Sequence, residues 1–209
     1  MKENRTLNTT LIITGVIFIS VSSFLLVKHI RNKSKKISCN DTILFLGDSQ
    51  TATSNGYVER YIRKCGNSKV KKIAQVGAKS EWVLEKYKED LSKGNTYKWV
   101  SVMIGVNDVF ARKSTEQTKR NLSELFRLVK SNGSKLLVMS SPSVAFYPVS
   151  DETHLSLSND LEKWLSENKK IDKFIPLIKK TNNASLFQSD GLHINSKGQD
   201  VVFNELLKS

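Results

Sequence analysis

Ile43-Leu44-Phe45-Leu46-Gly47-Asp48-Ser49 decides the fold of this chain. Its apolar run predicts a buried strand, and the glycine predicts a sharp turn into a helix. Ser49 therefore falls at the carboxyl end of a strand, which is where open α/β sheets bind their ligands. Its hydroxyl can cap the helix or act as a nucleophile, and Gly-Asp-Ser alone does not separate these two roles. Asp48 is expected to order the turn by accepting local amide hydrogen bonds, and it is also a candidate for the substrate pocket.

A second apolar run ends in the same way. Residues 100–104 lead directly into Gly105-Val106-Asn107-Asp108, so Asn107 is expected to share one edge of the sheet with Ser49. The Asn107 side chain is an amide donor beside a glycine, which lets a substrate oxygen approach closely. Asp108 is expected to make a structural hydrogen bond or to cap the next segment.

A third block, Asp190-Gly191-Leu192-His193, places an acid three residues before a histidine. A serine hydroxyl is a poor nucleophile until a base within hydrogen-bond reach removes its proton. His193 suits that role because Asp190 can fold back onto its ring and orient it. The sequence therefore predicts Ser49 as the nucleophile, His193 as the general base and Asp190 as the orienting acid.

With an isolated Gly77 between the first two blocks, the set resembles the GDSL/SGNH hydrolase superfamily over roughly residues 41–209. The resemblance implies an α/β fold, a three-layer α/β/α sandwich with a flavodoxin-like parallel sheet, and no metal or other cofactor. It also implies that the serine attacks an ester carbonyl. The implied oxyanion hole consists of the amides of Ser49 and Gly77 and the side chain of Asn107.

The chain departs from the family's fuller pattern in three places. Gln50 follows the serine where many members have leucine, at a position that mainly packs. The asparagine that often precedes the glycine of the second block is absent before Gly77, and Ile194 stands where proline frequently follows the histidine. The last change is expected to alter loop stiffness more than chemistry.

Residues 141–153 read as a loop because they include Pro142 and Pro148. The loop follows the carboxyl end of a predicted strand, so it is expected to border the catalytic pocket. Val144, Phe146 and Tyr147 look exposed and are candidates for shaping the acyl or leaving-group site. The alternative is a plain crossover loop.

The domain alternates apolar runs with segments of helical periodicity, which is typical of a parallel sheet covered by helices. The expected strands are Thr42–Leu46, Val70–Gln75, Trp99–Ile104, Lys135–Ser140 and Phe174–Ile178. The expected helices are Gly56–Cys65, Glu81–Leu91, Thr115–Ser131, His154–Asn168 and Ser196–Leu207, the last one capped by Ser196.

The first 40 residues are expected to form an N-terminal anchor and a basic linker. No charged residue occurs from Thr6 to Val27, and about 20 apolar residues are enough to span a bilayer as a helix. We therefore predict one transmembrane helix over about residues 7–27. A cleavable signal peptide is the alternative, but no small-x-small cleavage site lies near the end of the apolar stretch.

The flanking charges leave the orientation of this anchor open. Five cations follow the apolar stretch up to Lys36, against Lys2 and Arg5 before it. The positive-inside rule alone would place the domain in the cytoplasm. A tethered esterase usually has its substrates outside the cell, so we expect a single-pass, membrane-anchored protein with an extracytoplasmic domain.

The net charge of +13 suggests an anionic partner. The first 36 residues hold seven Lys or Arg and one acidic residue, which leaves 26 against 19 for the rest. The remaining lysines are scattered and are not interleaved with aromatic residues, so we exclude a nucleic-acid partner. An anionic lipid surface or an acidic cell-surface polymer is the better expectation.

The two cysteines, Cys39 and Cys65, precede the first strand and end the following helix. In a strand-turn-helix unit these positions lie at the same pole of the sheet, so a disulfide is geometrically possible. Two unpaired thiols are the alternative. No Cys-x-x-Cys or His-x-x-His spacing indicates a metal site.

Taken together, the sequence predicts a serine hydrolase that cleaves carboxylic esters through an acyl-enzyme. An O-acetyl or short-chain esterase acting on a glycan or cell-surface substrate is the first expectation. A lysophospholipase or thioesterase is the second, and a catalytically silent binding or structural module with the same fold is the third.

Overall fold

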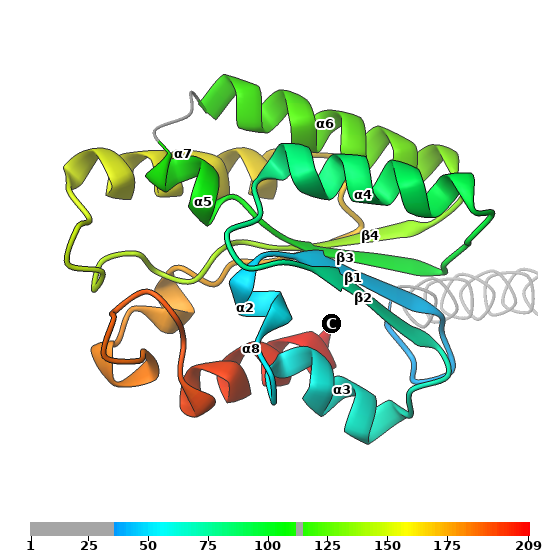
Figure 1. The fold of residues 1–209 in the computed structure, drawn as a ribbon, viewed down its shortest axis with the longest axis horizontal. Coiled ribbons are helices and arrows are strands. Elements are labelled where there is room, and N and C mark those ends of the chain that lie inside the picture. The colour runs from blue at the N-terminus through cyan, green and yellow to red at the C-terminus, as the bar shows by residue number, and fades with distance from the viewer. Residues whose placement is uncertain (1–35, 112–114) are drawn as a thin grey trace, which may run out of the picture. The chain divides into compact units, whose positions relative to one another are not determined.

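The computed structural model describes residues 36–111 and 115–209, which contain one α/β domain (Figure 1). The chain divides into the units Met1–Lys36 and Ile37–Ser209, and the second unit is the α/β domain. The predicted membrane helix lies outside the described residues. Within the described ranges, no helix is long and apolar enough to cross a bilayer.

The centre of the domain is a five-stranded sheet in which every paired neighbour runs parallel, in the order β2-β1-β3-β4-β5. The strands are β1 Ile43–Gly47, β2 Val70–Ala74, β3 Trp99–Met103, β4 Lys135–Met139 and β5 Lys173–Ile175. The helices are α2 Ser49–Ala52, α3 Tyr57–Cys65, α4 Ser80–Ser92, α5 Val106–Phe110, α6 Thr115–Ser131, α7 Glu152–Glu167 and α8 Ser196–Lys208. Two 3₁₀ turns, η1 Lys179–Thr181 and η2 Ala184–Leu186, precede α8.

Helices cover both faces of the sheet, which confirms the predicted three layers. Alternate residues of each strand point to opposite faces. Leu44 and Leu46 of β1 pack into the cluster that holds α4, α6 and α7, whereas Ile43 and Phe45 pack into the cluster that holds α3 and α8. Figure 1 shows the same division, with α4, α6 and α7 on one side of the sheet and α3 and α8 on the other.

One predicted strand end and one predicted helix cap differ in the structure. The sequence predicts the fifth strand at Phe174–Ile178, but the strand ends at Ile175, because Pro176 has no N–H to donate to a neighbouring strand. The predicted cap of the last helix is Ser196. The cap is instead Asn195, whose side chain accepts hydrogen bonds from the N–H groups of Lys197 and Gly198.

The structure contains the disulfide between Cys39 and Cys65, with a Cα–Cα distance of 4.7 Å. It joins the segment that enters β1 to the last residue of α3. Next to it, the N–H of Ile37 donates to the carbonyl of Ser209 at 3.3 Å. Both ends of the domain therefore lie at the pole where the strands begin.

Removing this disulfide is expected to destabilise the domain without touching the sheet. The two cysteines are 26 residues apart, and the chain-entropy model gives about 3 kcal/mol for a loop of that size. For a domain of this length, the Cys39→Ser, Cys65→Ser double variant should therefore unfold roughly 10 °C lower than the wild type. Dithiothreitol should lower the melting temperature of the wild type by a similar amount and leave that of the variant unchanged. Equal melting temperatures for the wild type and the variant, with and without dithiothreitol, would contradict the expectation.

Candidate active site

Ser49 begins α2 immediately after β1 ends at Gly47. A Cβ atom at Gly47 would lie 2.0 Å from Oγ1 of Thr51 and 2.7 Å from the carbonyl oxygen of Met103. Only glycine therefore lets the helix start directly at the carboxyl end of the strand. The turn places Ser49 at the edge of the sheet, with the residue 8% exposed.

Ser49, His193 and Asp190 form a continuous hydrogen-bonded series. The Oγ atom of Ser49 lies 3.0 Å from Nε2 of His193, and Nδ1 of the same ring lies 2.6 Å from Oδ2 of Asp190. One imidazole nitrogen thus faces the hydroxyl and the other faces a carboxylate. This arrangement fixes the tautomer that has a free electron pair at Nε2, and such a nitrogen can take the serine proton.

The backbone around His193 is shaped by Asp190 itself. Oδ1 of Asp190 accepts hydrogen bonds from the N–H groups of Leu192 and His193, both at 2.9 Å. Gly191 has a φ of +70°, and a Cβ atom there would lie 1.9 Å from the carbonyl oxygen of Phe146. A glycine is therefore required both by the backbone conformation and by the close packing of the 146–147 segment.

The carboxyl group of Asp190 is well placed to remain ionised. Burial acts to raise its pKa, but the hydrogen bonds from the ring and the amide of His193 and from the amide of Leu192 outweigh it, so the pKa is lowered from its usual value. The side chain is 41% exposed, and water also favours the charged form. A fixed negative charge next to Nδ1 stabilises the ring when it carries a second proton.

Asn107 and Gly77 lie at the same edge of the sheet. In the sheet register, Gly47 of β1 is paired with Ala74 of β2 and with Met103 of β3. The turns that follow these three strands carry Ser49, Gly77 and Asn107. The structure therefore brings the three predicted oxyanion-hole residues to three adjacent strand ends.

The Asn107 side chain is anchored to the turn that contains Gly77. Its Nδ2 atom donates to the carbonyl of Ala78 at 2.9 Å, which uses one of the two hydrogens on that nitrogen. Gly77 has a φ of +75°, a left-handed conformation that favours glycine. The glycine amide and the asparagine amide are thus held on one connected piece of structure.

A buried pair that the sequence did not reveal braces the same turn. Asp108, at 1% exposure, accepts a hydrogen bond from the N–H of Ser80 at 3.0 Å and one from its hydroxyl at 2.6 Å. The expected structural hydrogen bond of Asp108 is confirmed. Because Asp108 follows Asn107 and Ser80 begins α4, the pair fixes the turn that contains Gly77 relative to the turn that contains Asn107.

Two of the predicted pocket residues are buried, and their assignment is corrected. Asp48 is 0% exposed and caps α2 by accepting the N–H of Gln50, so it orders the turn but does not face a substrate. Val144 is 2% exposed. It lines a cavity of about 210 Å³ between the 143–145 segment, α7 and residues 178–182, and none of Ser49, Asn107 or His193 contributes to that cavity. A loop residue can be buried when the loop folds back onto the helices.

The other two pocket candidates lie next to residues 190–194, which carry His193 and are called the histidine loop below. The backbone of Phe146 and Tyr147 lies against Gly191. The ring of Phe146 packs 5.3 Å from that of Phe187, and the ring of Tyr147 packs edge-on at 4.9 Å from that of Phe110 in α5. Both rings are partly exposed, and they link the histidine loop to the helix that carries Asn107.

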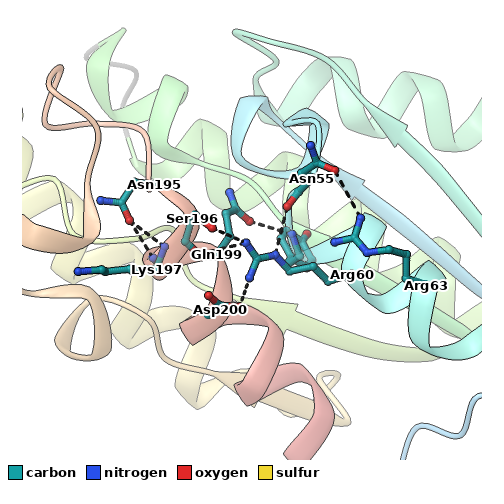
Figure 2. A network of polar contacts seen from close by, with 10 residues as sticks. Asn55, Arg60, Arg63, Asn195, Ser196, Lys197, Gln199 and Asp200 are labelled. Carbon is teal, nitrogen blue, oxygen red and sulfur yellow. Dashed lines mark hydrogen bonds and ion pairs between the residues drawn. The ribbon is translucent and has the colours of Figure 1, made fainter.

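A polar network ties the segment after His193 to α3 (Figure 2). Arg60 of α3 forms an ion pair with Asp200, and its guanidinium also donates to the hydroxyl of Ser196 at 2.9 Å. Gln199 accepts the first backbone N–H of α3 at 2.9 Å. The first turn of α8 is therefore held against the helix that follows the Ser49 turn.

The carboxyl group of Asp48 is titratable near neutral pH. Burial raises its pKa to about 7, and the nearby charge of Asp108 adds to the increase. The hydrogen bond from the N–H of Gln50 and the charge of His193 act to lower the pKa. Between about pH 4 and pH 7 the folded protein therefore holds a proton that the unfolded chain releases. This group makes the folded state less stable as the pH rises through that window.

The Asp48→Asn variant is expected to remove this pH dependence. Asparagine keeps the oxygen that caps α2 and stays neutral, so the variant should gain stability relative to the wild type at pH 8, on the order of a few kcal/mol, and little at pH 4. Melting temperatures of both proteins between pH 4 and pH 8 measure the effect. Asp160→Asn, at an exposed position, serves as the control, and a difference that is independent of pH would contradict the expectation.

Comparison with known proteins agrees with this geometry. The model of the GDSL-like Lipase/Acylhydrolase family matches residues 45–201, which include Ser49, Asn107 and His193. No curated protein matches the sequence.

Solved structures share the fold at low sequence identity. An acetylxylan esterase from Geobacillus stearothermophilus, Axe2, is 18% identical with a TM-score of 0.65, over 83% of this chain and 95% of that one. A GDSL-like lipase from Bacteroides thetaiotaomicron is 20% identical with a TM-score of 0.63, over 85% and 88%. The α/β hydrolase LAE5 from the metagenome of Lake Arreo is 16% identical with a TM-score of 0.65, over 82% and 95%. The fold is therefore that of the SGNH hydrolases, and since the family model spans most of the sequence, the chain belongs to the GDSL-like lipase/acylhydrolase family.

Proposed function

We propose that this protein is a serine esterase that cleaves carboxylic esters through an acyl-enzyme. The observation that carries the proposal is the series from Ser49 through His193 to Asp190, with hydrogen-bond distances of 3.0 and 2.6 Å at the carboxyl edge of the sheet. A hydroxyl, a base and an orienting acid in this arrangement have the geometry that activates a serine nucleophile.

The proposed reaction has two halves. In the first, Oγ of Ser49 attacks the ester carbonyl while Nε2 of His193 takes its proton, and the amides of Ser49 and Gly77 and the side chain of Asn107 donate to the resulting oxyanion. The C–O bond to the leaving alcohol then breaks, and the protonated His193 returns the proton to that oxygen. In the second half, water attacks the acyl group in the same manner and releases the acid.

The proposed substrate is an O-acetyl or other short-chain ester on a glycan. One support is that the acetylxylan esterase from Geobacillus stearothermophilus shares the fold. The partly exposed rings of Phe146 and Tyr147 beside the histidine loop are another, because aromatic faces pack well against sugar rings. The described ranges also contain no lid-sized insertion beyond the compact domain.

We further propose that residues 7–27 anchor the protein in a membrane and that the domain lies outside the cytoplasm. The uncharged stretch of the sequence supports the anchor, and the Cys39–Cys65 disulfide supports an oxidising compartment. Protease added to intact cells should then degrade the domain. Digestion only after the cells are lysed would place the domain in the cytoplasm.

The activity is tested with a series of p-nitrophenyl esters of increasing chain length and with an acetylated xylo-oligosaccharide. The expected result is fastest turnover of the acetyl ester, release of acetate from the oligosaccharide, and labelling of Ser49 by a fluorophosphonate, located by mass spectrometry. Preference for long acyl chains would instead indicate a lipid or thioester substrate. A folded protein with neither turnover nor labelling would overturn the esterase proposal.

A further inference from the structure

Gln50 contacts the histidine loop on both sides of His193. It is the residue directly after the nucleophile, and it is 2% exposed. Its Nε2 atom donates to the carbonyl of Leu192 at 2.9 Å, and its Oε1 atom accepts the N–H of Ile194 at 3.3 Å. One side-chain amide therefore pairs with the backbone groups that flank the histidine.

The orientation of this amide is fixed by its two partners. A carbonyl can only accept a hydrogen bond and a backbone N–H can only donate one, so the nitrogen of Gln50 must face Leu192 and the oxygen must face Ile194. These two hydrogen bonds resemble those between the backbones of two neighbouring strands. It joins α2 to a segment that lies 142 to 144 residues further along the chain.

The other described supports of the histidine loop do not reach α2. Asp190 bonds to the ring and backbone of its own loop, and the N–H of Gln188 bonds to the carbonyl of His193. Of the three hydrogen bonds described between α2 and residues 190–194, one is the bond between Ser49 and His193 and two belong to Gln50.

We propose that Gln50 is a positioning residue that sets the distance between Ser49 and His193. This inference rests on the proposed esterase function. It gives the turn that carries Ser49 a second residue with a role in that function. The sequence alone reads this position as one that mainly packs. In this chain the side chain carries a two-point contact that an apolar residue cannot make.

Leucine at this position would fill a similar volume but leave two backbone groups without a partner. The carbonyl of Leu192 and the N–H of Ile194 would then gain by moving toward water. Movement of the loop carries the ring of His193 away from Ser49. A displacement of about 1 Å at a reacting group costs roughly 100-fold in rate.

The test is the Gln50→Leu variant of the whole protein, assayed with p-nitrophenyl acetate. We expect kcat per folded molecule to fall about 10- to 100-fold and KM to stay within about threefold, since the defect lies in proton transfer and not in substrate binding. Fluorophosphonate labelling of Ser49 should slow by a similar factor. A loss of folded protein alone would lower the amount of active enzyme but leave kcat per folded molecule unchanged.

Gln188→Leu is the matched control, because it keeps the backbone N–H that donates to the carbonyl of His193 and removes only one side-chain hydrogen bond, from Nε2 of Gln188 to the carbonyl of Ile194 at 3.4 Å. Its kcat should stay within about twofold of the wild type. Gln50→Glu keeps the acceptor for Ile194 and loses the donor to Leu192, so it also should lower kcat, and it replaces Gln50→Leu if that variant does not fold. A folded Gln50 variant with wild-type kcat would overturn the proposal.

The outcome is distinguishable from a failure of the esterase proposal. If the wild type hydrolyses the ester and Ser49→Ala does not, the hydrolase stands, and an unaffected Gln50→Leu variant then removes only the positioning role. If the wild type itself shows no turnover and no labelling, the esterase proposal fails and the positioning role fails with it.

Discussion

The Ser49→Ala variant is expected to lose hydrolysis of p-nitrophenyl acetate almost completely, with a fall in kcat on the order of 10⁴- to 10⁶-fold. Alanine removes the oxygen that lies 3.0 Å from the ring of His193, so no acyl-enzyme can form. Fluorophosphonate labelling should disappear with the activity. The melting temperature should change little, because the hydroxyl of Ser49 faces the ring and not the core.

Ser189→Ala is a suitable control for this experiment, since Ser189 is exposed and directly precedes the orienting acid. It should hydrolyse the ester at the wild-type rate and keep the label. If Ser49→Ala retained more than a few per cent of the activity, the nucleophile would have to be sought elsewhere.

The Asp190→Asn variant is expected to reduce kcat by about 10³- to 10⁴-fold while leaving the loop in place. Asparagine can still accept the N–H groups of Leu192 and His193 through Oδ1. Its amide nitrogen then replaces Oδ2 and donates to Nδ1 of the ring. The ring is thereby held in the tautomer with hydrogen on Nε2, which cannot take the proton of Ser49.

Nitrogen NMR of the His193 ring distinguishes the two tautomers directly. The expected spectrum of the variant shows the proton on Nε2, with a melting temperature close to that of the wild type. A folded variant whose kcat remained within tenfold of the wild type would show that the orienting acid is not Asp190.

Much of the sheet and of the reactive series follows from local sequence. The strands β1 and β3 are apolar runs that lead into glycine, and both end within one residue of the predicted position. Ser49 and Asn107 could therefore be assigned to one edge, because parallel strands align their carboxyl ends. Asp190 and His193 are only three residues apart, so their pairing could also be predicted from local sequence. In the structure the carboxylate of Asp190 lies 2.6 Å from Nδ1 of the His193 ring.

The parts that sequence could not supply depend on distant contacts. Gln50 reads as a packing residue until its partners, more than 140 residues later, are known. The burial of Val144 depends on how its loop folds back, which no periodicity encodes. The short helices α2 and α5 span four and five residues, too few for a helical pattern to be visible.

The contact between Ile37 and Ser209 has a practical consequence for handling the protein. These two residues meet at 3.3 Å, at the pole opposite the edge that carries Ser49, because helices in this fold run back toward the strand starts. A solid support coupled to Ser209 would thus be attached at the same pole of the domain as Ile37. Enzyme immobilised in this way would present its reactive edge to the bulk solution, and a short loop joining the two residues would give a circularly permuted protein with new ends of the designer's choice.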